Sequence, residues 1–221
     1  MTASTANGPP MGNDQLFFGE RLPLGPVRRR SNLLVEGSRT DGAHDVLVEL
    51  VTAGRSASES TVLVSTESMP TDLVRRGERV ADRFGLVCCG GSPIDASEAP
   101  FPVSTPNDLT GIGIQYQKFA ERLSGDDGSV RVGLDSISTL LLYVNDPRTV
   151  FRFLHAFTGR VSTGGGLGVY HIDPEAHDDR TVNVIRQPFD GRVEVRDEDG
   201  LEIRVSGLPG QPEGWVPVNL D

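Results

Sequence analysis

Short apolar runs bounded by glycine and polar residues alternate along the chain with longer segments in which apolar residues recur at helical spacing. The short runs predict buried strands, and the longer segments predict amphipathic helices. We expect strands over residues 32–36, 61–65, 86–89, 130–136 and 167–172, and helices over 45–53 and 70–84, from 107 onward and from 146 onward. This alternation is typical of a parallel sheet with helices on both faces.

The pattern changes near the C-terminus. Residues 192–196 and 201–205 alternate apolar and polar positions, and the Asp197-Glu198-Asp199-Gly200 segment between them favours a hairpin turn. A last strand is expected over 215–218. We therefore predict a three-layer α/β domain with a mostly parallel sheet and a C-terminal antiparallel hairpin. It would form one domain over 15–221, behind a polar, disordered tail over 1–14.

The loop between the first strand and the first helix has two glycines at the spacing of a phosphate-binding loop, G-x-x-x-x-G-K-[ST]. It consists of Gly37-Ser38-Arg39-Thr40-Asp41-Gly42-Ala43-His44. Ala43 replaces the lysine that reaches the phosphates, and His44 replaces the hydroxyl that holds Mg²⁺. Asp41 adds a carboxylate that repels phosphate. Backbone N–H groups and the helix N-terminus can still attract an anion, and Arg39 could replace part of the lost charge.

These motifs together resemble the KaiC-like branch of the RecA superfamily, in the form found in haloarchaea, over residues 22–218. The resemblance rests on residues 32–37, 62–68, 131–138 and 189–195. It implies a RecA-like fold, with Glu67 at the position of the glutamate that activates the attacking water. It also implies that Asp135 helps to hold magnesium. Each residue has a structural alternative: Asp135 could cap the turn after its strand, and Glu67 could be a surface residue.

The acids that the resemblance requires are present, whereas the cationic clamp on the phosphates is absent. We therefore predict a catalytically inactive pseudo-ATPase that regulates or scaffolds through protein contacts, as a homo- or hetero-oligomer. One alternative is a weak ATPase that uses Arg39, with ATP and Mg²⁺ as cofactors; otherwise we assign no cofactor. A second alternative is a DNA-recombination accessory protein, for which the Arg28-Arg29-Arg30 cluster is the only basic candidate.

The charge of the chain restricts the classes of partner and environment that suit this protein. The formal net charge is −10, and Lys118 is the only lysine among 21 basic residues. An acidic, lysine-poor composition is typical of haloarchaeal proteins, and a GC-rich genome also favours arginine. The negative charge argues against a nucleic-acid partner, which would need a basic surface. We find neither a membrane-length apolar run nor a signal peptide, so we expect a cytoplasmic protein without a membrane partner.

Other polar residues offer weaker candidates. His44, Asp135 and His171 follow or end predicted strands, so they could meet at one edge of a parallel sheet, or they could be unrelated. No metal ligand is assigned. Cys88 and Cys89 lack zinc-ligand spacing and suit a buried strand. Ser136 and Ser138 have no paired histidine motif nearby, so we do not expect a serine hydrolase.

Overall fold

A computed structural model describes residues 14–19, 21–52, 59–66, 84–90, 103–123 and 129–220. The tail expected over 1–14 lies outside these residues except for Asp14. Glu67, the helix expected over 70–84 apart from Phe84, and most of the connection over 90–105 also lie outside them. Phe84 itself begins a strand.

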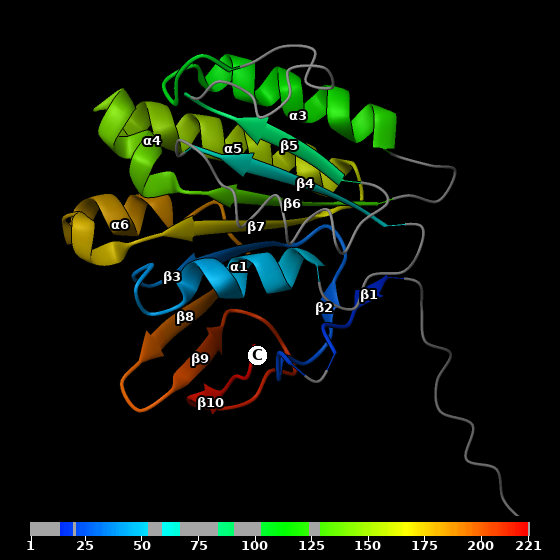
Figure 1. Cartoon of the computed structure of the whole chain (residues 1–221), viewed down its shortest axis with the longest axis vertical. Helices are drawn as coiled ribbons and strands as arrows, with labels where there is room; N and C mark the ends of the chain where they lie inside the picture. Colours follow the sequence, from blue (N-terminus) through cyan, green and yellow to red (C-terminus); the bar gives the residue numbers. More distant parts are fainter. Residues whose placement is uncertain are drawn as a thin grey trace, which may run out of the picture.

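An eight-stranded sheet runs through the molecule in the order β10-β9-β8-β3-β7-β6-β4-β5 (Figure 1). The strands from β8 to β5 pair in parallel, whereas β9 and β10 are antiparallel and form one edge. The strands are β3 Asn32–Glu36, β4 Ser60–Ser65, β5 Phe84–Cys88, β6 Val130–Asp135, β7 Leu167–Ile172, β8 Gly191–Asp197, β9 Leu201–Ser206 and β10 Val216–Pro217. A separate small hairpin joins β1 Gln15–Leu16 to β2 Val27–Arg28. The predicted α/β fold with a C-terminal antiparallel hairpin is confirmed.

Helices cover both faces of the sheet because strand residues point alternately to opposite sides. Leu33 and Val35 pack with helix α1, whereas Leu34 between them packs with the helices of the other face. One face carries α1 Ala43–Thr52. The other carries α3 Leu109–Leu123, α4 Ile137–Val144, α5 Pro147–Thr163 and the short α6 Asp179–Ile185, which follows the 3₁₀ turn η1 Pro174–Ala176. In the described part of the chain, no helix is long and apolar enough to cross a membrane.

The strand expected over 130–136 ends one residue early. The hydroxyl of Ser136 accepts a hydrogen bond from the backbone N–H of Thr139, which makes Ser136 the N-cap of α4. A serine in this position satisfies a first-turn N–H that no helical carbonyl can reach. The cap after this strand is therefore Ser136, and the interpretation of Asp135 as a capping residue was wrong.

Helix α1 lies across β6 in a way that sets up the candidate site. Arg131, Gly133 and Asp135 share one side of β6, and a Cβ on Gly133 would meet Leu47 of α1 at 3.1 Å. Arg131 donates to the carbonyl of Leu50 near the C-terminal end of α1, and Asp135 lies at the N-terminal end. The two charges thus match the dipole of the helix.

The basic cluster before β3 lies at the opposite end of the sheet from the phosphate loop. Arg29 forms an ion pair of 3.0 Å with the buried Glu59 and also contacts Ser129. The loop after Glu36 is separated from this end by the five residues of β3, roughly 16 Å of strand. Arg29 therefore holds the fold together at the amino end of the strands and does not reach a ligand at the loop.

Candidate functional site

The phosphate-loop segment connects β3 to α1 at the carboxyl end of the sheet. Five of the seven backbone N–H groups from Gly37 to Ala43 donate to acceptors of the chain itself. The five bonds are Gly37 N–H to Ile172 O, Thr40 N–H to Ser38 Oγ, Asp41 N–H to Ser38 O, Gly42 N–H to Arg39 O and Ala43 N–H to Ser38 O, at 3.2 to 3.4 Å. In an anion-binding loop these groups point at the ligand. Here the loop is a set of turns closed on itself.

The two glycines of the loop have packing reasons of their own. A Cβ on Gly37 would lie 2.9 Å from the carbonyl oxygen of Val195 in β8. Gly42 has a φ of +81°, and a Cβ there would lie 2.9 Å from Leu201 Cδ1 in β9. The glycine spacing that resembles a phosphate loop therefore also lets the loop pack against the β8–β9 hairpin.

Asp135 is the centre of the polar groups at this edge. Its carboxylate, almost fully buried, lies 2.9 Å from His171 Nδ1 through Oδ1. Its Oδ2 lies 2.9 Å from His44 Nδ1 and 3.1 Å from Arg39 Nη1. Three basic side chains, two from the loop and α1 and one from β7, therefore converge on one carboxylate. The possibility that His44, Asp135 and His171 meet is confirmed.

His171 links Asp135 to the loop. Its Nδ1 faces the carboxylate, and its Nε2 lies 3.0 Å from the carbonyl oxygen of Gly37. Both partners are acceptors only, so both ring nitrogens carry hydrogen when both bonds are made. The ring is buried, and its strand β7 lies between β3 and β6.

Burial and charge act in opposite directions on Asp135. Burial by itself raises the pKa of its carboxyl, but the neighbouring His171 and His44 lower it by more, through hydrogen bonding and charge. The net effect holds the pKa of Asp135 well below its usual value. The carboxylate is therefore ionised at neutral pH, and both of its oxygens contact basic side chains of its own chain.

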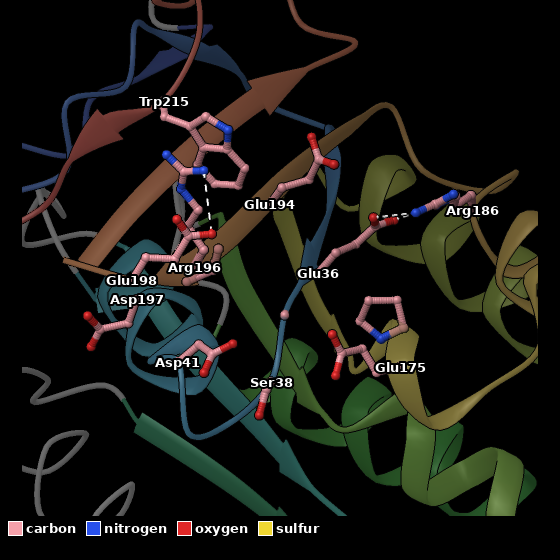
Figure 2. A pocket seen from close by; sticks show the side chains of 13 residues that line it. Glu36, Ser38, Asp41, Glu175, Arg186, Glu194, Arg196, Asp197, Glu198 and Trp215 are labelled. Atoms are coloured by element: carbon pink, nitrogen blue, oxygen red, sulfur yellow. Dashed lines mark hydrogen bonds and ion pairs between the residues drawn. The ribbon is translucent and has the colours of Figure 1, made fainter. Parts of the chain in front are cut away.

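A cavity of about 340 Å³ opens beside the loop (Figure 2). Its wall includes Ser38 and Asp41 of the loop and Trp215 before β10. Six carboxylates and two guanidinium groups line it. The charged residues are Glu36, Asp41, Glu175, Glu194, Asp197 and Glu198 with Arg186 and Arg196. The negative excess opposes the entry of a phosphate group.

Both arginines of this cavity are already paired. Arg186 binds the buried Glu36 through two bonds of 2.7 Å. Arg196 donates to Glu202 at 2.7 Å and stacks over Trp215, with its guanidinium carbon 4.2 Å from the ring centroid. Neither pair could be predicted from a local sequence pattern, because one joins different elements and the other joins neighbouring strands. Both guanidinium groups of the cavity are therefore engaged with partners of the chain itself.

Among the described residues, no group of three or more His, Cys, Asp and Glu side chains is arranged to hold a metal ion. His44 and His171 each contact Asp135 directly. Cys88 ends β5 and Cys89 is buried, where burial raises the pKa of its thiol to about 12. These cysteines fit the expected role of small strand residues.

The sheet order, the helices on both faces and the loop after β3 define an α/β protein with a RecA-like fold. Its structure is similar to that of the KaiC-like protein PH0186 from the hyperthermophilic archaeon Pyrococcus horikoshii OT3. The TM-score is 0.64 at 11% sequence identity, over 89% of this chain and 88% of that one. Residues 30–195 match the family described as "Family of unknown function (DUF7504)", and the chain belongs to that family. A comparison with curated proteins found no match.

Proposed function

We propose that this protein is a pseudo-ATPase of the KaiC-like fold, which regulates or scaffolds other proteins and does not hydrolyse ATP. The observation that carries the proposal is the direct contact of Asp135 with Arg39, His44 and His171. In the related ATPases this carboxylate would serve a magnesium ion. Here basic side chains of the chain itself occupy both carboxylate oxygens, so magnesium binding would require breaking these contacts.

The loop supports the same conclusion. Phosphoryl transfer depends on cationic groups and oriented N–H donors that stabilise charge on the phosphate oxygens. Ala43 supplies no charge, most of the loop N–H groups are used internally, and Arg39 is held by Asp135. The acidic cavity beside the loop adds repulsion. Each feature weakens the binding of a nucleoside triphosphate. Together they oppose ATP hydrolysis more strongly than any one of them does alone.

A role in protein contacts is supported by helix α4. Leu142 and Tyr143, next to each other on this helix, are 76% and 54% exposed. Large apolar side chains exposed side by side are a feature of protein-binding surfaces. We propose that this face of α4 contacts a protein partner or another copy of the chain, in a cytoplasm whose high salt suits the acidic composition.

The first test measures nucleotide binding and turnover. Isothermal titration with ATP and Mg²⁺ at high salt should give neither micromolar affinity nor turnover for the wild-type protein. The double variant Ala43→Lys, His44→Thr restores the lysine and the hydroxyl and removes one cation from Asp135, so it should bind ATP at least tenfold more tightly. Micromolar binding by the wild type, with turnover that disappears in Glu67→Gln, would overturn the proposal.

The second test addresses the protein contact. The molar mass of the purified protein and the set of proteins cross-linked to it in its native cells should change in the Leu142→Asp, Tyr143→Asp variant. The control is Ile114→Asp, an equally large exposed apolar residue on α3, at 49% exposure. Identical masses and identical cross-links in all three proteins would remove α4 as the contact surface.

A further inference from the structure

A serine and a histidine meet at the carboxyl edge of the sheet, and the hydrogen bonds of their side chains involve no residue of the loop between β3 and α1. His177 Nε2 lies 2.9 Å from Ser138 Oγ. Both residues are half-buried, so both are reachable from solvent. The sequence suggested no histidine partner for Ser138, because the two residues are 39 positions apart. The fold brings them together by placing α4 beside the turn that follows β7.

The hydrogen bonds around Ser138 orient its hydroxyl toward His177. The backbone N–H of Asp173 donates to Ser138 Oγ at 3.0 Å, which uses one lone pair of the oxygen. The hydroxyl proton then has two acceptors within reach, His177 Nε2 at 2.9 Å and the carbonyl oxygen of Asp173 at 3.5 Å. The imidazole offers the shorter bond. Ser138 can therefore donate its proton to a neutral His177.

His177 is held in place by turns on both sides of it. Its backbone N–H donates to the carbonyl of Pro174, which closes η1. Asp173 caps η1, and Asp178 caps α6, so both neighbouring carboxylates are used in capping bonds. Burial lowers the pKa of His177, while the charges of Asp173 and Asp178 act the other way. The net lowering leaves the ring neutral, and thus able to accept a proton, at neutral pH.

Ser138 also lies in the first turn of α4, where the positive end of the helix dipole stabilises negative charge on a nearby oxygen. A hydroxyl within hydrogen-bond reach of a positioned base is the arrangement that activates serine as a nucleophile. We infer that Ser138 and His177 form a nucleophile–base dyad that accepts acyl groups from activated esters. Among the described residues, no carboxylate orients His177 through a side-chain hydrogen bond. We therefore expect the dyad to react only with activated esters, whose leaving groups depart easily.

The reaction would proceed in two steps. Ser138 Oγ attacks the acyl carbon while His177 Nε2 takes the hydroxyl proton; the bond between the acyl carbon and the leaving alcohol breaks, and the alcohol departs with that proton. Water then attacks the acyl carbon while His177 Nε2 takes a proton from it; the bond between the acyl carbon and Ser138 Oγ breaks, the carboxylic acid leaves, and His177 returns the proton to Oγ. Asp135 and the phosphate loop take no part in this reaction. The activity of the dyad and the proposed lack of ATP hydrolysis can therefore be tested independently.

The test is labelling with a fluorophosphonate probe, which forms a stable bond to an activated serine with loss of fluoride, followed by mass spectrometry of peptides. We expect one adduct, at Ser138, which disappears in Ser138→Ala. His177→Gln should lower the labelling rate about 10²-fold or more, as expected for the loss of a general base. Ser162→Ala removes another half-buried serine, one that donates to the carbonyl of Arg30, and should leave labelling unchanged.

The pH profile of the wild type keeps the test valid if a variant folds poorly. The labelling rate should be constant above neutral pH and should fall in acid, as His177 takes up a proton and ceases to act as a base. Turnover of p-nitrophenyl acetate should show the same profile. The inference is overturned if the wild type is not labelled, if the adduct lies on another residue, or if His177→Gln reacts as fast as the wild type.

Discussion

Helix α1 has a buried carboxylate near each end, one held by two arginines and the other by two histidines and an arginine. At its C-terminal end Glu59 forms an ion pair of 3.0 Å with Arg131, which is itself fully buried, and another of 3.0 Å with Arg29. At its N-terminal end Asp135 is held by His171 and His44, together with the half-exposed Arg39. The two carboxylates are equally buried, and their distances to the basic groups are similar, but the basic side chains that contact them differ in chemistry.

The two clusters should respond differently when their carboxylate is removed. Arginine does not lose its proton in proteins, so a buried guanidinium without its carboxylate is left as an uncompensated charge. The cluster at the amino end of the strands is a buried ion pair in which one guanidinium is fully buried. The cluster at the carboxyl end consists of two imidazoles and a half-exposed guanidinium around one carboxylate.

The largest effect should come from Glu59→Gln. It removes the charge that compensates the buried Arg131, and breaking a buried ion pair from one side costs about 3 to 5 kcal/mol. Chemical denaturation should show this loss in the free energy of unfolding. Glu198→Gln, which removes a largely exposed carboxylate with one long ion pair of 3.8 Å, is the control and should change stability very little. Equal losses in the two variants would show that the Glu59 cluster is not a buried ion pair.

A smaller loss is expected for Asp135→Asn, about 2 kcal/mol at pH 7, because hydrogen bonds to a charged group are lost. The arginine at this end, Arg39, is half-exposed and is not left as a buried charge. The loss should depend on pH. The pKa of Asp135 is lower in the folded than in the unfolded protein, so its contribution is full above the unfolded value near 4 and declines as pH falls below that value. Denaturation from pH 7 to pH 3 should show the two proteins converging in acid. A constant difference would contradict the low pKa.

The smallest effect tests the loop itself. Gly42→Ala places a side chain at a φ of +81° and within 2.9 Å of Leu201, and should cost about 1 to 2 kcal/mol. Gly159→Ala is the matched control, because Gly159 lies within α5 with no atom within 4 Å of its Cβ position. It should stabilise the protein by about 0.5 to 1 kcal/mol. Thermal unfolding of both variants checks the difference in sign.

Much of the fold followed from apolar periodicity. The strands over 32–36 and 167–172 and the hairpin before residue 206 lie where they were expected. The pattern predicted less well where local hydrogen bonds set a boundary, as at Ser136, whose side chain ends β6 by capping α4. The seven-residue α6 was not predicted, because so short a helix carries too few apolar positions to show a period.

The candidate site, like the fold, could be predicted from the sequence only in part. The residue types alone show which groups the loop lacks, since Ala43 cannot supply a charge and His44 cannot supply a hydroxyl. What the remaining groups do depends on the folded chain. Parallel strands bring residues that are distant in sequence to one edge of the sheet, so Asp135 meets Arg39, His44 and His171, and Ser138 meets His177. These contacts depend on strand order and side-chain direction, which a single sequence does not encode in any local pattern.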